Sequence, residues 1–147
     1  MRAVVQRVSQ AEVVVGGIPV ARIGPGILAL VAISRHDEEK DLLWMAGKIT
    51  DLRIFDDEGG KLNLSLRDIK GELLIVSQFT LYGDCQKGRR PSYSEAAPPR
   101  EAEAMYRQFV SIVRQFVPEA QTGQFQATME VKLTNSGPVT LILDSCR

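Results

Sequence analysis

Apolar residues along the first quarter of the chain follow the pattern of β-strands. Residues 3–8 and 11–15 are rich in β-branched side chains, which favour strands. A glycine pair at 16–17 supplies a turn, and residues 20–23 return along the same sheet. Residues 27–33 are apolar on both faces, a pattern typical of a central buried strand. This region therefore predicts a strand-rich start to the fold.

Two later segments repeat apolar residues at helical spacing. The first predicted helix has one apolar face, made by Leu42, Met45, Ala46, Ile49 and Leu52. Acidic residues 37–39 are expected in its first turn, where the helix dipole favours negative charge. The second predicted helix begins at Pro99, which suits a first helical turn, and ends at Pro118. Its apolar stripe is made by Met105, Phe109, Ile112, Val113 and Phe116.

The remaining segments complete the predicted sheet. Residues 62–66 alternate like a half-buried strand, and residues 73–76 form a second buried run that leads directly into residues 77–81. Residues 123–144 predict a C-terminal hairpin, because Asn135-Ser136-Gly137-Pro138 is made of turn-forming residue types. Together these elements predict a mostly antiparallel α+β domain with two main helices.

Length and charge narrow the function classes. A chain of 147 residues with 44% hydrophobic content fits a single domain over residues 1–147. Eighteen basic and eighteen acidic residues cancel, which argues against disorder and against a protein that coats nucleic acid without selectivity. A nucleic-acid role would need a local patch. The cluster Lys87-Gly88-Arg89-Arg90-Pro91 is the candidate for phosphate contacts, although such clusters are usually plain surface.

No feature predicts secretion, a membrane span or a bound metal. The first apolar run is broken at Gln6 and Arg7, unlike a signal peptide. Residues 27–33, the longest apolar stretch, are far shorter than the ~20 residues that a membrane span needs. Cys85 and Cys146 lack the close spacing of a zinc motif. We expect a cytoplasmic protein with free thiols, no membrane association and no cofactor.

Familiar catalytic arrangements are also missing. His36 is the one histidine, and it lies in a polar stretch where we expect a surface residue. A Ser-His-Asp or Cys-His site is therefore not expected. Cys85 lies near Lys87 and Arg89, which can lower a thiol pKa, but a free loop thiol is the simpler interpretation.

Two segments remain as candidates for chemistry. Ser77-Gln78-Phe79-Thr80-Leu81 places hydroxyl and amide groups abruptly at the end of an apolar strand, where functional groups often sit on a rigid support. Backbone amides at such a place can stabilise an oxyanion. The alternative is a polar strand end that bonds to its neighbours. Asn135-Ser136-Gly137-Pro138, taken alone, is more typical of an ordinary turn.

Taken together, residues 76–81 and 135–140 resemble the two signature motifs of the D-aminoacyl-tRNA deacylases. Further similar segments occur in the same order, and these are residues 5–8, 53–56, 61–64, 88–92 and 121–125. The resemblance covers essentially the whole chain, including its length. Either motif alone is weak evidence, but both in order in a chain of this size are specific.

The resemblance implies a barrel-like core and a hydrolase that clears D-amino acids from aminoacyl-tRNA, with activity on glycyl-tRNA(Ala) as well. It implies a homodimer whose active sites lie at the subunit interface. Ser77, Gln78 and Thr80 match the catalytic segment of the family. Ser77 and Gln78, together with Phe79, are expected to line the pocket for the aminoacyl group and the terminal adenosine.

The resemblance also gives the second motif a role in substrate selection. It implies that the Gly137–Pro138 bond is cis and that this turn, with Val139 and Thr140, reaches into the partner's site. There the turn would admit a D-residue or glycine and exclude an L-residue by steric conflict. Arg7 matches a first-strand arginine that supports the turn in this family.

The chemical step has two candidate forms. Thr80 matches a position proposed as a nucleophile in the family, but no histidine or lysine is placed to activate it, and an unactivated hydroxyl is a poor nucleophile. The alternative is assistance by the neighbouring ribose hydroxyl of the tRNA, with the protein supplying position and backbone donors. We favour the second. Two other functions stay open: a non-catalytic RNA-binding module, and a small-molecule ester or amide hydrolase that uses Thr80.

Overall fold

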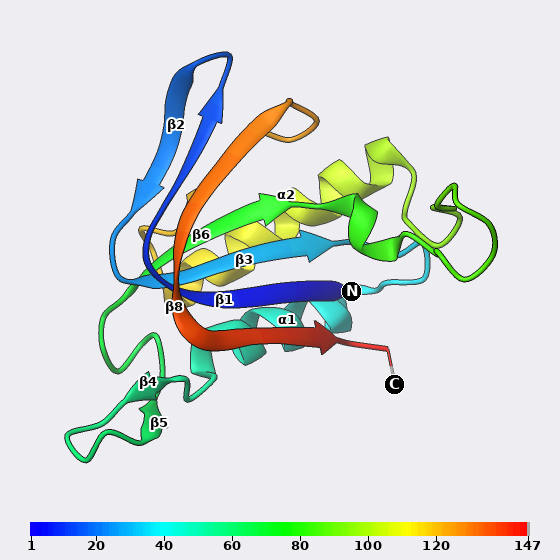
Figure 1. The fold of residues 1–147 in the computed structure, drawn as a ribbon. Coiled ribbons are helices and arrows are strands. Elements are labelled where there is room, and N and C mark those ends of the chain that lie inside the picture. Colours follow the sequence, from blue (N-terminus) through cyan, green and yellow to red (C-terminus); the bar gives the residue numbers. More distant parts are fainter. Residues whose placement is uncertain (147) are drawn as a thin grey trace.

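The strand β1 is the central element of the structure, a computed structural model that describes residues 1–146 (Figure 1). It pairs antiparallel with β2, β3 and β8. β3 pairs parallel with β6, and β6 pairs parallel with β7. The strands of this sheet are β1 (Arg2–Val15), β2 (Ile18–Ile23), β3 (Gly26–Ala32), β6 (Glu72–Ser77), β7 (Gln121–Thr122) and β8 (Met129–Asp144).

This mixed sheet curves until it is nearly closed into a barrel, because β2 also contacts β6 and β7 at the far side. A separate short pair, β4 (Phe55–Asp56) and β5 (Leu62–Leu64), extends from the end of the barrel. The expected α+β class with two main helices and a barrel-like core is confirmed. Parallel pairing of β3, β6 and β7 is the feature that the strand pattern alone did not predict.

The two apolar runs of the sequence form the adjacent strands β3 and β6 at the centre of the sheet. They pair in register from Gly26 with Glu72 to Val31 with Ser77. Gly26 permits this contact, since a Cβ at that position would lie 1.8 Å from the carbonyl oxygen of Glu72. Because parallel strands end at the same edge of a sheet, the end of β6 at Ser77 lies beside the end of β3.

Helices α1 (Glu39–Asp51) and α2 (Pro99–Phe116) pack against each other over one face of the sheet (Figure 1). Their predicted apolar stripes are buried in the main core, apart from Leu52 and Met105, which are partly buried, and Phe116, which stays exposed. One detail of the prediction was wrong. Asp37 lies before the helix rather than in its first turn, and Glu38 is the N-cap. None of the helices in residues 1–146 is long and apolar enough to span a membrane.

The C-terminal segment differs from the predicted hairpin. Residues 129–144 form one long strand, β8, and both of its halves pair antiparallel with β1. Thr140 pairs with Gln6 and Asn135 pairs with Val8, so residues 136–139 form an excursion within the strand instead of a chain reversal. Turn-forming residues occur both in strand bulges and in hairpins. The two cases differ in pairing: the two halves of a hairpin pair with each other, whereas here both halves pair with β1.

Candidate functional site

The first motif lies where β6 changes into a short helical turn. β6 ends at Ser77, and the 3-10 helix η1 (Phe79–Tyr82) follows immediately, with Gln78 as its N-cap. The backbone amide of Gln78 donates to the carbonyl of Val31 at 2.7 Å, which fixes this junction to the end of β3. The change from strand to helix therefore presents polar groups at a rigid edge of the sheet.

A cavity of about 860 Å³ opens beside this junction. Ser77, Gln78 and Phe79 form one wall, and the start of α2 and the start of β8 form others. The remaining lining residues are mostly apolar, and they include Ile33, Val76, Tyr93, Ala102, Phe125 and Met129. Arg35 is the one lining residue that is charged at neutral pH. The cavity thus combines an apolar surface with few polar groups, which is common in ligand sites.

The side chains of Gln78 and Thr80 are bonded to each other. The amide nitrogen Nε2 of Gln78 donates to the Oγ1 of Thr80. Thr80 itself is exposed and does not line the cavity. The backbone amides of Phe79 and Thr80 begin η1, and the first amides of a helix have no acceptor within it. Two backbone donors therefore lie at the start of η1, and one of them belongs to Phe79, which lines the cavity. The hydroxyl of Thr80 contacts the side-chain amide of Gln78 and not a basic group.

Two aromatic rings stand at the rim of the cavity. Phe79 and Tyr93 meet edge to face with ring centroids 5.2 Å apart. They are 53% and 40% exposed respectively, which is unusual for large aromatic residues. Exposed aromatic rings at a cavity rim provide surfaces on which a planar base can stack.

The second motif is held in the middle of β8 by side chains from β1. The Gly137–Pro138 bond has the cis isomer that the resemblance implies. Arg7 donates through Nε to the carbonyl of Ser136 at 3.2 Å and through a second nitrogen to the carbonyl of Ile54 at 2.9 Å. The side chain of Asn135 bridges the carbonyls of Arg7 and Val139.

These contacts anchor the backbone of the excursion and leave its outer surface free. Val139 is buried, whereas Gly137, Pro138 and Thr140 are exposed. Thr140 lies beside Asn135, to whose side-chain oxygen its hydroxyl donates at 3.4 Å. The exposed part of the turn therefore faces away from its own chain.

The two motifs lie apart within one chain, near opposite ends of the strand β3. Ser77 pairs with Val31, which pairs with Ala3, whereas the Gly137 excursion lies beside Arg7. Four residues of a strand span about 13 Å. None of Arg7, Gly137, Pro138, Val139 and Thr140 lines the cavity beside Ser77. A single copy of this chain therefore does not bring its two motifs together.

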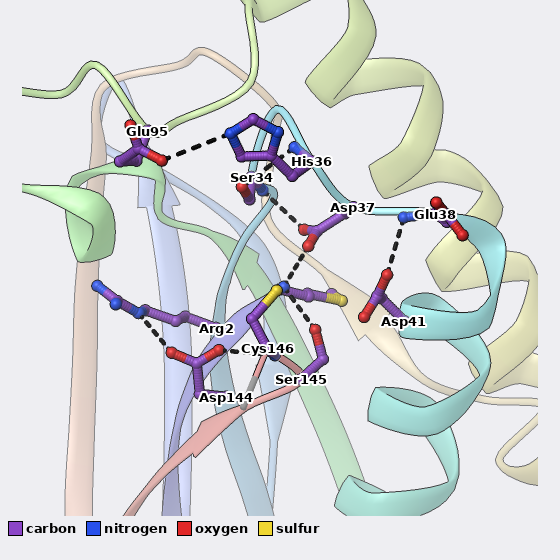
Figure 2. Close-up of polar contacts among 11 residues, drawn as sticks. Arg2, Ser34, His36, Asp37, Glu38, Asp41, Glu95, Asp144, Ser145 and Cys146 are labelled. Carbon is purple, nitrogen blue, oxygen red and sulfur yellow. Dashed lines mark hydrogen bonds and ion pairs between the residues drawn. The ribbon is translucent and has the colours of Figure 1, made fainter.

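Sequence reasoning missed a buried polar cluster at the start of the chain, which Figure 2 shows. The α-amine of Met1 is fully buried, forms an ion pair with Asp37 and donates to Ser145 Oγ at 2.7 Å. The other carboxylate oxygen of Asp37 accepts from the amide of Ser34 at 2.7 Å. Partners 36 and 144 residues apart leave no local signal in the sequence.

Asp37, Asp41 and Cys146 also place their ligand atoms within 4.8 Å of one another. Both oxygens of Asp37 are already bonded, and Asp41 accepts from the amide of Glu38 at 2.9 Å. Hydrogen-bond donors of the protein therefore already occupy the carboxylate oxygens of Asp37 and one carboxylate oxygen of Asp41.

The other reactive side chains do not line the cavity. His36 is exposed and lies 3.7 Å from Glu95, as expected for a surface residue. Cys85 and Cys146 are exposed free thiols, which confirms the prediction for both. None of the three lines the cavity beside Ser77.

Comparison with known proteins gives one consistent result. A family model described as D-Tyr-tRNA(Tyr) deacylase matches residues 4–144. A protein named D-aminoacyl-tRNA deacylase from Thermosipho africanus is 57% identical over 145 residues, which cover 99% of this chain and 97% of the relative. A protein of the same name from Thermotoga petrophila is 53% identical and covers 100% of this chain and 99% of the relative.

Two solved structures have the same fold. One is named c-Myc DNA Unwinding Element Binding Protein, with a TM-score of 0.93 and 43% identity, and the match covers 98% of both chains. The other is a probable eukaryotic D-amino acid tRNA deacylase, with a TM-score of 0.82 and 20% identity over 97% of both chains. The second likeness is evidence for the fold alone.

Proposed function

This chain belongs to the D-Tyr-tRNA(Tyr) deacylase family, and on that basis we propose that it hydrolyses the ester bond of D-aminoacyl-tRNA. The observation that carries this proposal is the near-complete match to relatives named D-aminoacyl-tRNA deacylase, with identities of 57% and 53%. The chain is accordingly a carboxylic ester hydrolase that releases a free D-amino acid and tRNA. The cavity beside Ser77 is the place for that ester.

The cavity suits the 3′ end of an aminoacyl-tRNA. Ser77 and Gln78 supply hydrogen-bonding groups on one wall, and the opposite walls are apolar. Phe79 and Tyr93 at the rim offer exposed rings for the terminal adenine. We place the aminoacyl group inside the cavity and the adenosine at its mouth.

The chemistry that fits these groups is hydrolysis assisted by the substrate. A water molecule attacks the ester carbonyl carbon, the carbon–oxygen bond to the ribose breaks, and the ribose oxygen takes up a proton. The backbone amides of Phe79 and Thr80 are suited to stabilise the negative charge on the carbonyl oxygen. The cavity lining contains no histidine, lysine or carboxylate that would act as a base. The neighbouring ribose hydroxyl of the tRNA is therefore assigned a relay: it accepts a proton from the attacking water and passes its own proton to the leaving ribose oxygen.

Replacing Thr80 with Ala tests this assignment. We expect the deacylation rate to fall by less than about tenfold, because the exposed Thr80 hydroxyl contacts Gln78 and does not line the cavity. Single-turnover kinetics with D-tyrosyl-tRNA measures the rate of the chemical step. A loss of several orders of magnitude in a variant with an unchanged melting temperature would identify Thr80 as the nucleophile instead.

Discrimination between D- and L-aminoacyl groups is assigned to the Gly137–Pro138 turn of a second copy of the chain. Within one copy this turn is exposed and lies beside Arg7, four residues along β1 from Ala3, the residue that is level with Ser77. The outer edge of β8 has no partner strand among residues 1–146, and its side chains Leu141 and Ile142 are exposed. A homodimer with sites at the interface would bring the turn to the cavity, where it would exclude an L-residue and admit a D-residue or glycine.

Separate assays with D-tyrosyl-tRNA and L-tyrosyl-tRNA test the proposed function. The D-substrate should be deacylated rapidly and the L-substrate should remain charged, with release of labelled amino acid as the measurement. Glycyl-tRNA(Ala) should be deacylated as well, since glycine has no side chain for the turn to exclude. Equal deacylation rates for D-tyrosyl-tRNA and L-tyrosyl-tRNA, or no release of D-tyrosine, would overturn the proposal.

Two other functions give different results in the same assay. A nucleic-acid-binding module would bind the charged tRNA without turnover, and the solved relative named as a DNA unwinding element binding protein makes this a natural competitor. A small-molecule esterase that uses Thr80 would cleave free D-aminoacyl esters as fast as the tRNA substrate. The proposed function requires turnover, and requires that it depend on the tRNA.

A further inference from the structure

The loop that joins η1 to α2 carries three positive charges within four residues. Lys87, Arg89 and Arg90 are all exposed. No ion pair found among residues 1–146 includes any of them. The nearby acidic residue Asp84 has a different partner, because its carboxylate accepts from the backbone amide of Gln86 at 2.9 Å. In a chain with no net charge, this loop is a local positive surface.

The loop has a defined shape at its base. Asp84 and Ser92 form an antiparallel bridge, with amide-to-carbonyl distances of 2.7 and 3.0 Å. Gly88 at the tip has a φ of +72°, which glycine adopts at low cost. Figure 1 shows the loop projecting beyond the ends of β3 and β6. The three cations are therefore held out from the body on a closed hairpin-like support.

This support stands next to the mouth of the cavity. Tyr93 follows the bridge directly, lines the cavity and packs against Phe79. Arg90 is three residues from Tyr93, so their Cα atoms are at most about 11 Å apart. A nucleic-acid strand in a helix rises about 3.4 Å per nucleotide, and about three nucleotides span the same distance. The loop can therefore reach the strand that leads into the cavity.

We propose that Lys87, Arg89 and Arg90 bind the phosphates of the tRNA 3′ strand just before the terminal adenosine. This inference rests on the proposed function and assigns the loop a part in it. Guanidinium groups match phosphate oxygens in geometry and charge, and the interaction needs no base identity. The loop therefore raises affinity for tRNA in general and positions the 3′ end over the aromatic rim, while Ser77, Gln78 and the turn of the second copy select the aminoacyl group.

The experiment compares two substrates in one set of variants. The first substrate is D-tyrosyl-tRNA, and the second is the ester of D-tyrosine with adenosine, which has no phosphate. The test variant is Lys87→Ala/Arg89→Ala/Arg90→Ala. The charge-retaining variant is Lys87→Arg/Arg89→Lys/Arg90→Lys. Lys70→Ala is the matched control, because Lys70 is an exposed lysine that does not line the cavity beside Ser77.

We expect the alanine variant to raise KM for D-tyrosyl-tRNA about tenfold or more at low salt and to leave kcat/KM for the adenosine ester unchanged. The slope of log KM against log salt should fall by about one for each phosphate contact removed. The charge-retaining and Lys70→Ala variants should behave like the wild type. Unchanged KM for tRNA, or an equal loss on both substrates, would overturn the assignment of the loop. Failure of the wild-type protein to cleave D-tyrosyl-tRNA would overturn the proposed function itself.

Discussion

At the scale of single residues, Gly137 has very little around it within its own chain. A Cβ added there would meet only the side-chain oxygen of Asn135, at 4.0 Å. The surrounding backbone is held from the other side by Arg7 and Asn135. The small size of residue 137 is therefore unnecessary for folding of one copy, and it matters for whatever docks on the turn.

Gly137→Ala is predicted to lower deacylation of D-tyrosyl-tRNA at least tenfold, about 1.4 kcal/mol in the barrier, without lowering the melting temperature. The reason is that the added methyl group would enter the space proposed for the substrate of a second copy. Gly47→Ala in α1 is the matched control, since a Cβ there also meets nothing within 4 Å, and it should keep full activity. Wild-type activity in the Gly137→Ala variant would show that the turn is not part of the active site.

At the scale of secondary-structure elements, the start of α1 is stabilised by a side chain of its own first turn. Asp41 accepts from the backbone amide of Glu38 in a capping box. Burial acts to raise the pKa of the Asp41 carboxyl, but the Glu38 amide, Ser145 and nearby positive charge outweigh it and hold the pKa below its ordinary value of 3.8. A carboxyl whose pKa is lower in the folded state contributes stability that is complete above its unfolded pKa.

This contribution should therefore be lost as the pH falls below 3.8 and passes through the lower folded pKa. Asp41→Asn is predicted to lose up to about 1 kcal/mol of stability at pH 7, a value typical of helix caps, and to differ little from the wild type in strong acid. Melting temperatures measured from pH 7 down to strong acid, with Glu58→Gln as a surface control, test this. A constant difference across all pH values would contradict it.

The elements also mark the limit of what the sequence could predict. Apolar runs identified the buried strands β3 and β6, because burial on both faces leaves a local pattern. Helical periodicity identified α1 and α2 for the same reason. The register of β8 against β1 leaves no local pattern in the sequence. The residue types of the Asn135–Pro138 segment therefore predict a hairpin turn, which the structure does not contain. The Ser77 segment was found by its abrupt change in polarity, whereas the partners of Asp37 lie too far away in sequence to suggest one another.

At the scale of the whole molecule, β1 separates the two halves of the proposed site. The cavity lies where β3 and β6 end, and the Gly137 turn lies beside Arg7, midway along β1 and level with the start of β3. In a dimer with two-fold symmetry, each cavity would receive the turn of the other copy, so a dimer would contain two equivalent sites. A damaged cavity and a damaged turn that are carried by different copies would then meet in the same site, and the other site of that dimer would stay intact.

Mixing two inactive variants is therefore predicted to restore activity. Ala127→Trp fills the cavity, and Gly137→Trp blocks the turn. After refolding of an equal mixture, half of the dimers carry one of each variant, and each of these has one undamaged site. About a quarter of wild-type activity should return under two-fold symmetry. The two variants should be inactive alone, and no recovery in the mixture would place both motifs in the same copy.

The pairing of β1 with β8 joins residues 2–15 to residues 129–144. During synthesis, the strand made first must wait for the strand made last. At about 5–20 residues per second, that interval is roughly 6 to 25 s on the ribosome. Throughout it, one edge of β1 and the apolar faces that β8 covers stay open to other chains. Dependence on chaperones during synthesis is therefore expected to be greatest in this protein before β8 emerges.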